Sequence, residues 1–367
     1  MGKKVTLSVI KADVGGLAGH SGVHPDIPVI AEEWMKKGIE AGIIEDAYVT
    51  SVGDDLQLIM SHYAGEEDEK VHKLAWDAFQ AGAKRSAELK LCGVGQDFLS
   101  DEFKGTIRGL GPSFVEMTFE ERKNETFVVL MADKTSPGAW NYPLYKIFAD
   151  AFNTIGLAIK PELARGFRFE VHNIRERKRI FLDTPVDIYN LLALIGTAGV
   201  YAVKTVATKD GDIAAVSSTD LLNLERGVHV GKEDPVCVIR AQSQFPAVGE
   251  LMEPFAQPHL VEGWERGAHF APLMPVAQAQ AHPSRSDGPP RVVAMGFQLA
   301  NGKLIGPRDL FDDPGFDQAR TECNLMANYL RRMGPFEPSR LSLESMQYTT
   351  LPLMIDNMAD RFEKIEK

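Results

Sequence analysis

Cysteine is scarce in this sequence, and the three residues present, Cys92, Cys237 and Cys323, are widely separated without any C-x-x-C spacing. This scattered, odd-numbered set argues against a disulfide framework and a cysteine-rich zinc site. It is typical of a reducing compartment, and we expect a cytoplasmic protein. Positive charge is also in deficit, because 40 Lys and Arg face 51 Asp and Glu, for a net charge of −11. Nucleic acid and anionic membranes are therefore not expected as partners.

Long apolar runs are missing as well. The longest apolar-rich stretch, residues 189–203, is interrupted by Asn190 and Thr197. It is shorter than the roughly 20 residues needed to span a bilayer. The apolar part of the N-terminus, residues 5–10, is too short for a signal peptide. Hydrophobic residues nevertheless make up 44% of the chain, so we expect a soluble globular protein with a sizeable core.

The apolar patterning predicts strands and helices that interleave without strict β-α-β alternation. Residues 27–42, 67–90 and 351–367 have helical spacing, whereas 47–52 and 56–61 indicate two strands joined by a short turn. Such adjacent strand pairs favour hairpins and a mixed or antiparallel sheet. No repeat or linker is evident, so residues 1–367 are predicted to form one compact, intertwined domain of the α/β (α+β) class.

Aspartates follow the predicted strands at several points. Asp13 comes after 5–10, Asp54 and Asp55 separate 47–52 from 56–61, and Asp133 comes after 126–131. Each alone is more typical of a turn than of a ligand. Strands of one sheet can bring such ends together, where clustered carboxylates would repel unless a cation lay between them. Oxygen ligands in this number suit Mg²⁺ or Mn²⁺.

Other candidates extend this set. Glu233 and Asp234 form a fourth acidic site in G-K-E-D-P, His20 follows G-G-L-A-G, and Gln96 lies in another glycine-rich stretch. Neither glycine-rich stretch has the pattern of a Walker A loop or of G-x-G-x-x-G. Arg266 is a candidate for phosphate, although a surface ion pair is the commoner role of such an arginine. Taken singly, each residue also fits a turn, a loop or the surface.

Together, the motifs resemble the fructose-1,6-bisphosphate aldolase/phosphatase family, the bifunctional gluconeogenic enzyme of archaea and some deep-branching bacteria. The motifs include K-A-D-V-G-G-L-A-G-H, V-G-D-D-L-Q-L-I-M, M-A-D-K-T-S-P-G-A-W-N, V-G-K-E-D-P and Y-T-T-L-P. They extend from about residue 5 to the C-terminus with nearly collinear spacing. The resemblance implies a four-layer α-β-β-α sandwich, a homo-octamer, several Mg²⁺ ions per subunit and sugar phosphates as substrates.

The resemblance also implies two reactions at one site. Dihydroxyacetone phosphate and glyceraldehyde 3-phosphate condense through a lysine Schiff base, and Mg²⁺-dependent hydrolysis of the 1-phosphate then gives fructose 6-phosphate. It places metal ligation on Asp13, His20, Asp54, Asp55, Gln96, Asp133, Glu233 and Asp234. It places the Schiff base on Lys232 and aldol proton transfer on Tyr348. His229, at the position of a second proton-transferring residue of the family, is a candidate acid or base or else a strand histidine without a catalytic role. It places substrate contacts on Lys134, Gln242, Arg266, Asp287, His20 and the backbone around Gly105.

Three positions depart from the family pattern. His229 stands where the family usually has tyrosine, Glu233 where it has aspartate, and Cys92 where it has a phosphate-contacting tyrosine. Two alternatives therefore stay open: a monofunctional Mg²⁺-dependent sugar-bisphosphate phosphatase, and a non-catalytic sugar-phosphate sensor. In G-K-E-D-P, Lys232 stands directly before Glu233, and neighbouring side chains of an extended segment point to opposite faces. We therefore hypothesise that this loop has two states, one that presents Lys232 to the substrate and one that presents Glu233 and Asp234 to the metal.

Overall fold

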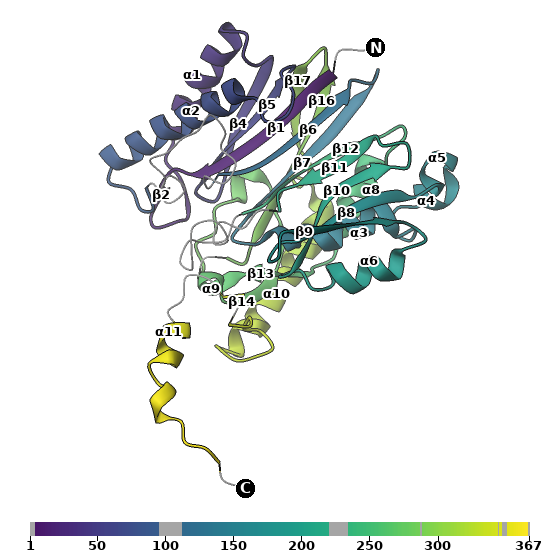
Figure 1. The fold of residues 1–367 in the computed structure, drawn as a ribbon. Coiled ribbons are helices and arrows are strands. Elements are labelled where there is room, and N and C mark those ends of the chain that lie inside the picture. Colours follow the sequence, from purple (N-terminus) through teal and green to yellow (C-terminus); the bar gives the residue numbers. More distant parts are fainter. Residues whose placement is uncertain are drawn as a thin grey trace.

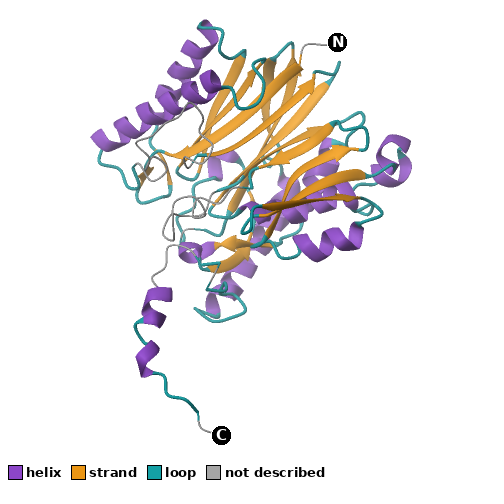
Figure 2. Cartoon of the chain, viewed as in Figure 1, coloured by secondary structure: helices purple, strands orange, loops and turns teal. Residues whose placement is uncertain are grey.

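The computed structural model describes residues 4–94, 112–219, 234–286, 288–343, 345–346 and 351–365. Two antiparallel sheets lie against each other, with helices on their outer sides (Figures 1 and 2). This arrangement confirms the predicted α/β class with paired, antiparallel strands. Among the described residues, no helix combines the length and apolar character needed to cross a bilayer.

The smaller sheet has the order β4-β5-β1-β6 and is antiparallel throughout. Its strands are β1 (Lys4–Asp13), β4 (Asp46–Val52), β5 (Asp55–His62) and β6 (Ser113–Glu120). β4 and β5 form the hairpin that the sequence predicted. Its register pairs Val52 with Asp55, so the turn consists of Gly53 and Asp54. This turn holds two of the predicted carboxylates at one end of the sheet.

The larger sheet has nine strands in the order β15-β16-β7-β12-β11-β10-β8-β9, with β17 beside β16. Only the β15–β16 pair is parallel among the described pairs. The strands are β7 (Glu125–Asp133), β8 (Phe167–Asn173), β9 (Lys178–Asp183), β10 (Tyr201–Thr208), β11 (Ile213–Ser217), β12 (Val236–Ala241), β15 (Met274–Pro275), β16 (Arg291–Ala300) and β17 (Lys303–Asp309). Short pairs are β2 (Gly16–Leu17) with β3 (Gly22–Val23) and β13 (Leu260–Gly263) with β14 (His269–Pro272).

The hydrophobic residues gather in three main clusters that follow the layers. One lies between the smaller sheet and helices α1 (Asp26–Glu40) and α2 (Glu69–Glu88). The second joins the facing sides of β1, β6, β7, β12 and β16, so it lies between the two sheets. The third lies between the larger sheet and helices such as α3 (Asn141–Ala149), α6 (Ile188–Ile195) and α8 (Val248–Met252). The packing order is therefore helix, sheet, sheet, helix.

The remaining helices are short or peripheral. They are α4 (Gly156–Ile159), α5 (Pro161–Ala164), α9 (Trp264–Gly267), α10 (Asp317–Arg332), α11 (Leu351–Asp356) and the 3-10 turns η2 (Pro137–Trp140), η3 (Glu253–Ala256), η4 (Gln278–Gln280), η5 (Pro314–Phe316) and η6 (Ala359–Arg361). The helices predicted over 27–42 and 67–90 are confirmed. Asp68 caps α2 by accepting hydrogen bonds from the Lys70 and Val71 amides at 3.0 and 3.1 Å. The helix predicted over 351–367 is wrong beyond Asp356, because residues 362–365 are not helical.

Candidate metal centre

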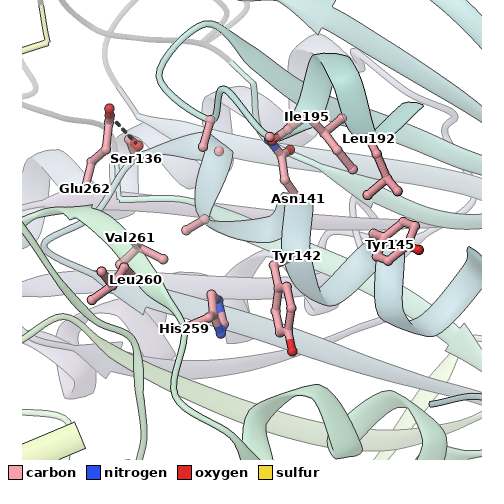
Figure 3. A pocket seen from close by; sticks show the side chains of 14 residues that line it. Ser136, Asn141, Tyr142, Tyr145, Leu192, Ile195, His259, Leu260, Val261 and Glu262 are labelled. Carbon is pink, nitrogen blue, oxygen red and sulfur yellow. Dashed lines mark hydrogen bonds between the residues drawn. The ribbon is translucent and has the colours of Figure 1, made fainter. Parts of the chain in front are cut away.

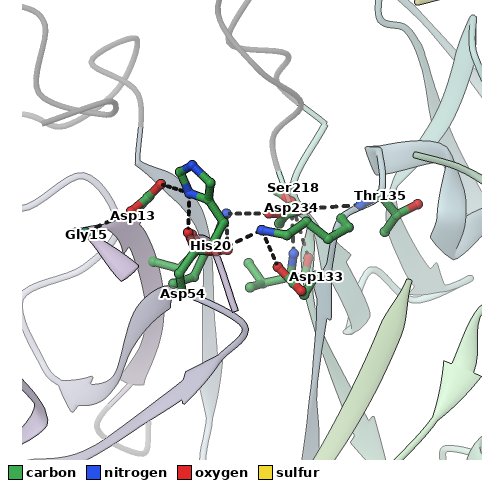
Figure 4. Close-up of polar contacts among 12 residues, drawn as sticks. Asp13, Gly15, His20, Asp54, Asp133, Thr135, Ser218 and Asp234 are labelled. Carbon is green, nitrogen blue, oxygen red and sulfur yellow. Dashed lines mark hydrogen bonds and ion pairs between the residues drawn. The ribbon is translucent and has the colours of Figure 1, made fainter. Parts of the chain in front are cut away.

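The strand ends of both sheets bring five aspartates to one place, and Figure 4 shows Asp13, Asp54, Asp133 and Asp234 together. Asp13 ends β1 and pairs in register with Asp55, which begins β5. Asp133 ends β7, and Asp234 lies two residues before β12, the neighbour of β7. These aspartates were all predicted as ligands from the sequence. Their side chains form two groups whose ligand atoms lie within 4.8 Å of one another: Asp13 with His20 and Asp54, and Asp55 with Asp133 and Asp234.

The first group is the more exposed of the two. His20 Nδ1 is 2.6 Å from Asp54 Oδ2 and 3.9 Å from Asp13 Oδ2. The His20 side chain is 36% exposed, whereas that of Asp54 is only 3% exposed. Asp13 Oδ1 accepts a hydrogen bond from the Gly15 amide at 2.8 Å. A Cβ at Gly16 would lie 2.9 Å from the Asp54 Cβ, so glycine permits this close approach.

The second group is buried and lacks a full set of hydrogen bonds. Neither carboxylate oxygen of Asp133 has a hydrogen-bond partner among the described residues, although Lys134 Nζ lies 3.3 Å away. Burial, and then the nearby charge of Asp234, raises the pKa of Asp133 well above its ordinary range, against the opposing effect of Lys134. Burial also raises the pKa of Asp234 to about 7. A divalent cation would supply the missing partner and favour the ionised carboxylates, so these residues fit a metal.

Lys134, predicted as a substrate contact, connects the two groups. Its Nζ is 2.8 Å from Asp54 Oδ1 and 3.3 Å from Asp133 Oδ1. Burial alone would lower the pKa of Lys134, but these carboxylates outweigh it and raise the pKa well above its ordinary value. Its backbone has a positive φ of 65°. A Cβ at Gly263 would lie 1.9 Å from the Lys134 carbonyl oxygen, so β13 can pack here only with glycine.

Lys11 is a site residue that the sequence reasoning missed. Its Nζ is 2.7 Å from Asp55 Oδ2 and 3.7 Å from Asp234 Oδ2, and its side chain is only 4% exposed. The ammonium therefore links the two sheets within the second group. One signal was present in the sequence: Lys11 precedes Asp13 by two residues, and side chains two apart on a strand share a face.

The structure does not place the other predicted site residues in the metal centre. Gln96, Gly105, His229, Lys232, Glu233, Asp287 and Tyr348 lie outside the described residues. Arg266 belongs to α9, but its side chain is not among those described. Gln242 directly follows β12 at the end opposite Asp234, where its carbonyl accepts a hydrogen bond from Arg122 Nη1 at 2.9 Å. Six strand residues, roughly 20 Å, separate it from the carboxylates of the same chain. Its role in substrate binding stays a prediction.

Cys92 lies beside the first group of ligands. The Gly16 amide donates to the Cys92 carbonyl at 2.9 Å, and the Cys92 amide donates to the Gly16 carbonyl at 3.2 Å. The Cys92 residue is exposed. Cys92, one of the three departures from the family pattern, therefore pairs with Gly16, whose backbone lies against Asp54.

Two groups of oxygen-rich side chains, connected by Lys134 at the meeting ends of two sheets, are the arrangement expected of an α/β enzyme that binds a divalent metal ion. The family model described as fructose-1,6-bisphosphatase matches residues 4–363, and the chain belongs to this family. Membership implies dependence on a divalent metal ion, for which the two acidic groups are suited. The resemblance inferred from the motifs is therefore confirmed.

Similar proteins cover essentially the whole chain. A protein of Ignicoccus hospitalis is 56% identical over 366 residues, covering 100% of this chain and 95% of the relative. One of Moorella thermoacetica is 54% identical, covering 100% and 96%. One of Methanocaldococcus jannaschii is 54% identical, covering 99% and 93%. All three are named fructose-1,6-bisphosphate aldolase/phosphatase.

Proposed function

We propose that the chain is a bifunctional fructose-1,6-bisphosphate aldolase/phosphatase. It condenses dihydroxyacetone phosphate with glyceraldehyde 3-phosphate and hydrolyses the 1-phosphate of the product to give fructose 6-phosphate. Full-length relatives that carry this name support the assignment. Within the structure, the observation that carries it is the second acidic group, because Asp133 has two buried oxygens without hydrogen bonds. A divalent cation would supply the missing partners, and a phosphatase of this kind uses such an ion.

We propose that Mg²⁺ is the native ion, with Mn²⁺ as a substitute, because hard carboxylate oxygens dominate the ligand set. Asp13, His20 and Asp54 would hold one position, and Asp55, Asp133 and Asp234 another. Gln96 and Glu233 are proposed as further ligands. When bound, Mg²⁺ neutralises phosphoryl charge and activates water.

The two lysines of the site are proposed to offset the negative charge of the carboxylates and of the substrate phosphate. Lys134 lies between the two groups and can pair with a phosphate oxygen beside the first group, where Asp54 now holds it at 2.8 Å. Lys11 lies 2.7 Å from Asp55 Oδ2 and 3.7 Å from Asp234 Oδ2, where its charge opposes the rise in the pKa of Asp234 that burial causes. Because both ammoniums are fixed by carboxylates, they need little reorganisation when a charged substrate enters.

The aldol step is proposed to use Lys232. Its neutral amine adds to the ketone of dihydroxyacetone phosphate, and loss of water gives the Schiff base. Tyr348 and His229 would move protons during carbon–carbon bond formation, since imidazole has an ordinary pKa of about 6.5. Asp287, Arg266, Gln242, His20 and the Gly105 backbone are proposed substrate contacts. The two-state loop would present Lys232 for condensation and the acids for phosphate release.

One protein sample can test both activities. Phosphate release from fructose 1,6-bisphosphate should require Mg²⁺ and stop with a chelator. Borohydride with dihydroxyacetone phosphate should trap an adduct on Lys232, found by peptide mass, and K232M should abolish it. Phosphate release without trapping would indicate a monofunctional phosphatase, and binding without either activity would indicate a sensor. H229A should slow carbon–carbon bond formation much more than phosphate release, and equal losses would refute its aldol role.

The remaining expectations concern assembly and location. We propose that residues 1–367 act as one unit, that eight copies assemble, and that the enzyme works in the cytoplasm on sugar phosphates, without nucleic acid or membrane partners. Sedimentation of the purified protein would give the copy number directly.

A further inference from the structure

A second cavity lies outside the metal centre (Figure 3). It occupies about 200 Å³ among η2, α3, α6 and the start of β13. Its walls are formed mainly by ring and aliphatic side chains, including Tyr142, Tyr145, Leu192, His259 and Val261. None of the described metal-ligand candidates lines it. Since an apolar cavity of 150 Å³ holds benzene, this volume suits one or two fused rings.

His259 has unused hydrogen-bonding capacity in this cavity. Both of its ring nitrogens are buried without a hydrogen-bond partner among the described residues. Its ring packs on Tyr142, with centroids 4.6 Å apart and planes at 33°. Burial lowers the pKa of His259 to about 4, against a smaller opposing effect of the Ala139 backbone. The neutral ring has one donor and one acceptor, and leaving such groups unpaired in a buried place is unfavourable.

The Asn141 side chain, which also lines the cavity, already has partners within the protein. Asn141 Nδ2 donates to the carbonyls of Ile195 and Tyr201 at 2.9 and 2.7 Å, and Asn141 Oδ1 accepts from the Val203 amide at 3.0 Å. Of the two side chains, His259 is therefore the one that can offer hydrogen bonds to a ligand. A molecule that complements this cavity is flat and mostly apolar, with a polar nitrogen or oxygen facing the imidazole.

One wall of the cavity continues into the metal centre. The Glu262 carbonyl accepts a hydrogen bond from Thr135 Oγ1 at 2.7 Å, and the Thr135 amide donates to Asp234 Oδ1 at 2.9 Å. Ser136 Oγ also donates to Glu262 Oε2 at 3.2 Å. A ligand that shifts β13 or η2 would therefore move the backbone that orients Asp234.

We propose that this cavity is a binding site for a small, uncharged, flat heteroaromatic molecule that hydrogen-bonds to His259, and that its occupation changes the affinity of the metal centre. A ligand with both a ring N–H and a ring nitrogen acceptor fits either tautomer of His259, whichever one the Ala139 backbone favours.

Benzimidazole is a suitable probe, and indene, of the same shape without nitrogen, is its control. Calorimetry should show saturable binding of about one benzimidazole per chain, with a Kd of about 1 mM or tighter. Indene should bind at least about fivefold more weakly, as the loss of one hydrogen bond predicts. H259F keeps a ring on Tyr142 but removes both nitrogens, so it should erase this difference. Equal binding of both probes to the native protein would overturn the proposed contact.

Three tryptophan variants locate the binding. V261W adds a large ring at a lining position that is only 4% exposed and should abolish saturable binding, whereas L325W adds the same ring at a position of α10 that is 64% exposed and should not. L192W, at a lining position that is 39% exposed, should weaken binding to a lesser extent. Unfolding temperatures establish that all three variants fold. Benzimidazole binding that survives V261W, or that is lost equally in L325W, would overturn the site.

The coupling has its own measurement. Calorimetric Mg²⁺ titration with saturating benzimidazole should give a midpoint shifted at least about twofold, and by linkage Mg²⁺ must change the benzimidazole affinity by the same factor. An unchanged Mg²⁺ midpoint in the presence of bound benzimidazole would refute the coupling. These readouts are heats of binding and need no turnover, so they stand apart from the test of catalytic activity.

Discussion

Replacing Gly53 by alanine should weaken metal binding through a single contact. Gly53 has φ +61°, and a Cβ built on it would lie 2.3 Å from Asp133 Oδ1. Ordinary contact begins near 3.4 Å, so the carboxylate would have to retreat by about 1 Å. Metal–oxygen distances tolerate only about 0.2 Å of error, so the displaced Asp133 would be a poor ligand.

The chain contains a matched control for the backbone strain. Gly42 has φ +67°, but a Cβ there would meet nothing within 4 Å. Both G53A and G42A should lose about 1–2 kcal/mol of unfolding free energy, because each puts a side chain in the left-handed region. Only G53A also moves a ligand. The difference between the two variants therefore isolates the contact with Asp133.

We expect G53A to raise the Mg²⁺ concentration at half-maximal binding by about 10–100-fold, the range found when ligand-supporting contacts are removed. This corresponds to about 1.4–2.8 kcal/mol of binding free energy. G42A should leave the midpoint unchanged. Calorimetric Mg²⁺ titration and Mg²⁺-dependent phosphate release would both measure this half-maximal concentration. The reasoning would be refuted by an unchanged midpoint in G53A, or by an equal shift in G42A.

Two other substitutions test the charges of the fold. K11M removes the ammonium 2.7 Å from Asp55, so the metal-free protein should lose about 3–5 kcal/mol of unfolding free energy, with partial recovery in Mg²⁺; identical urea curves for K11M and the native protein in chelator would contradict this. A hydrogen bond from His172 lowers the pKa of Glu170 from 4.5 to about 2. Because the folded value is depressed, its stabilisation should be complete above about pH 4.5 and lost as pH falls toward 2. E170Q should flatten the acid limb of a urea-midpoint profile, whereas E33Q, on an exposed face, should leave it unchanged.

The local elements followed from the sequence because their causes are local. The helix over 67–90 was predicted from its apolar spacing, and the cap at Asp68 adjoins it in the chain. The β4–β5 turn was predicted from G-D-D between two apolar runs. The helix predicted over 351–367 was wrong only beyond Asp356, where Phe362 and Ile365 are 76% and 97% exposed and so gain little packing from the described residues.

The metal centre separates what the sequence determined from what only the tertiary structure decided. The sequence by itself determined which residue types stand at the strand ends, so Asp13, Asp54 and Asp133 were found as candidates before any contact was known. Only the tertiary structure decided that Lys11 neutralises Asp55 and Asp234, since the two aspartates come from different sheets. The same holds for His259, whose unpaired nitrogens exist only because separate elements enclose them. Strand ends are encoded by neighbouring residues, whereas burial and charge pairing depend on groups that the chain brings together only by folding.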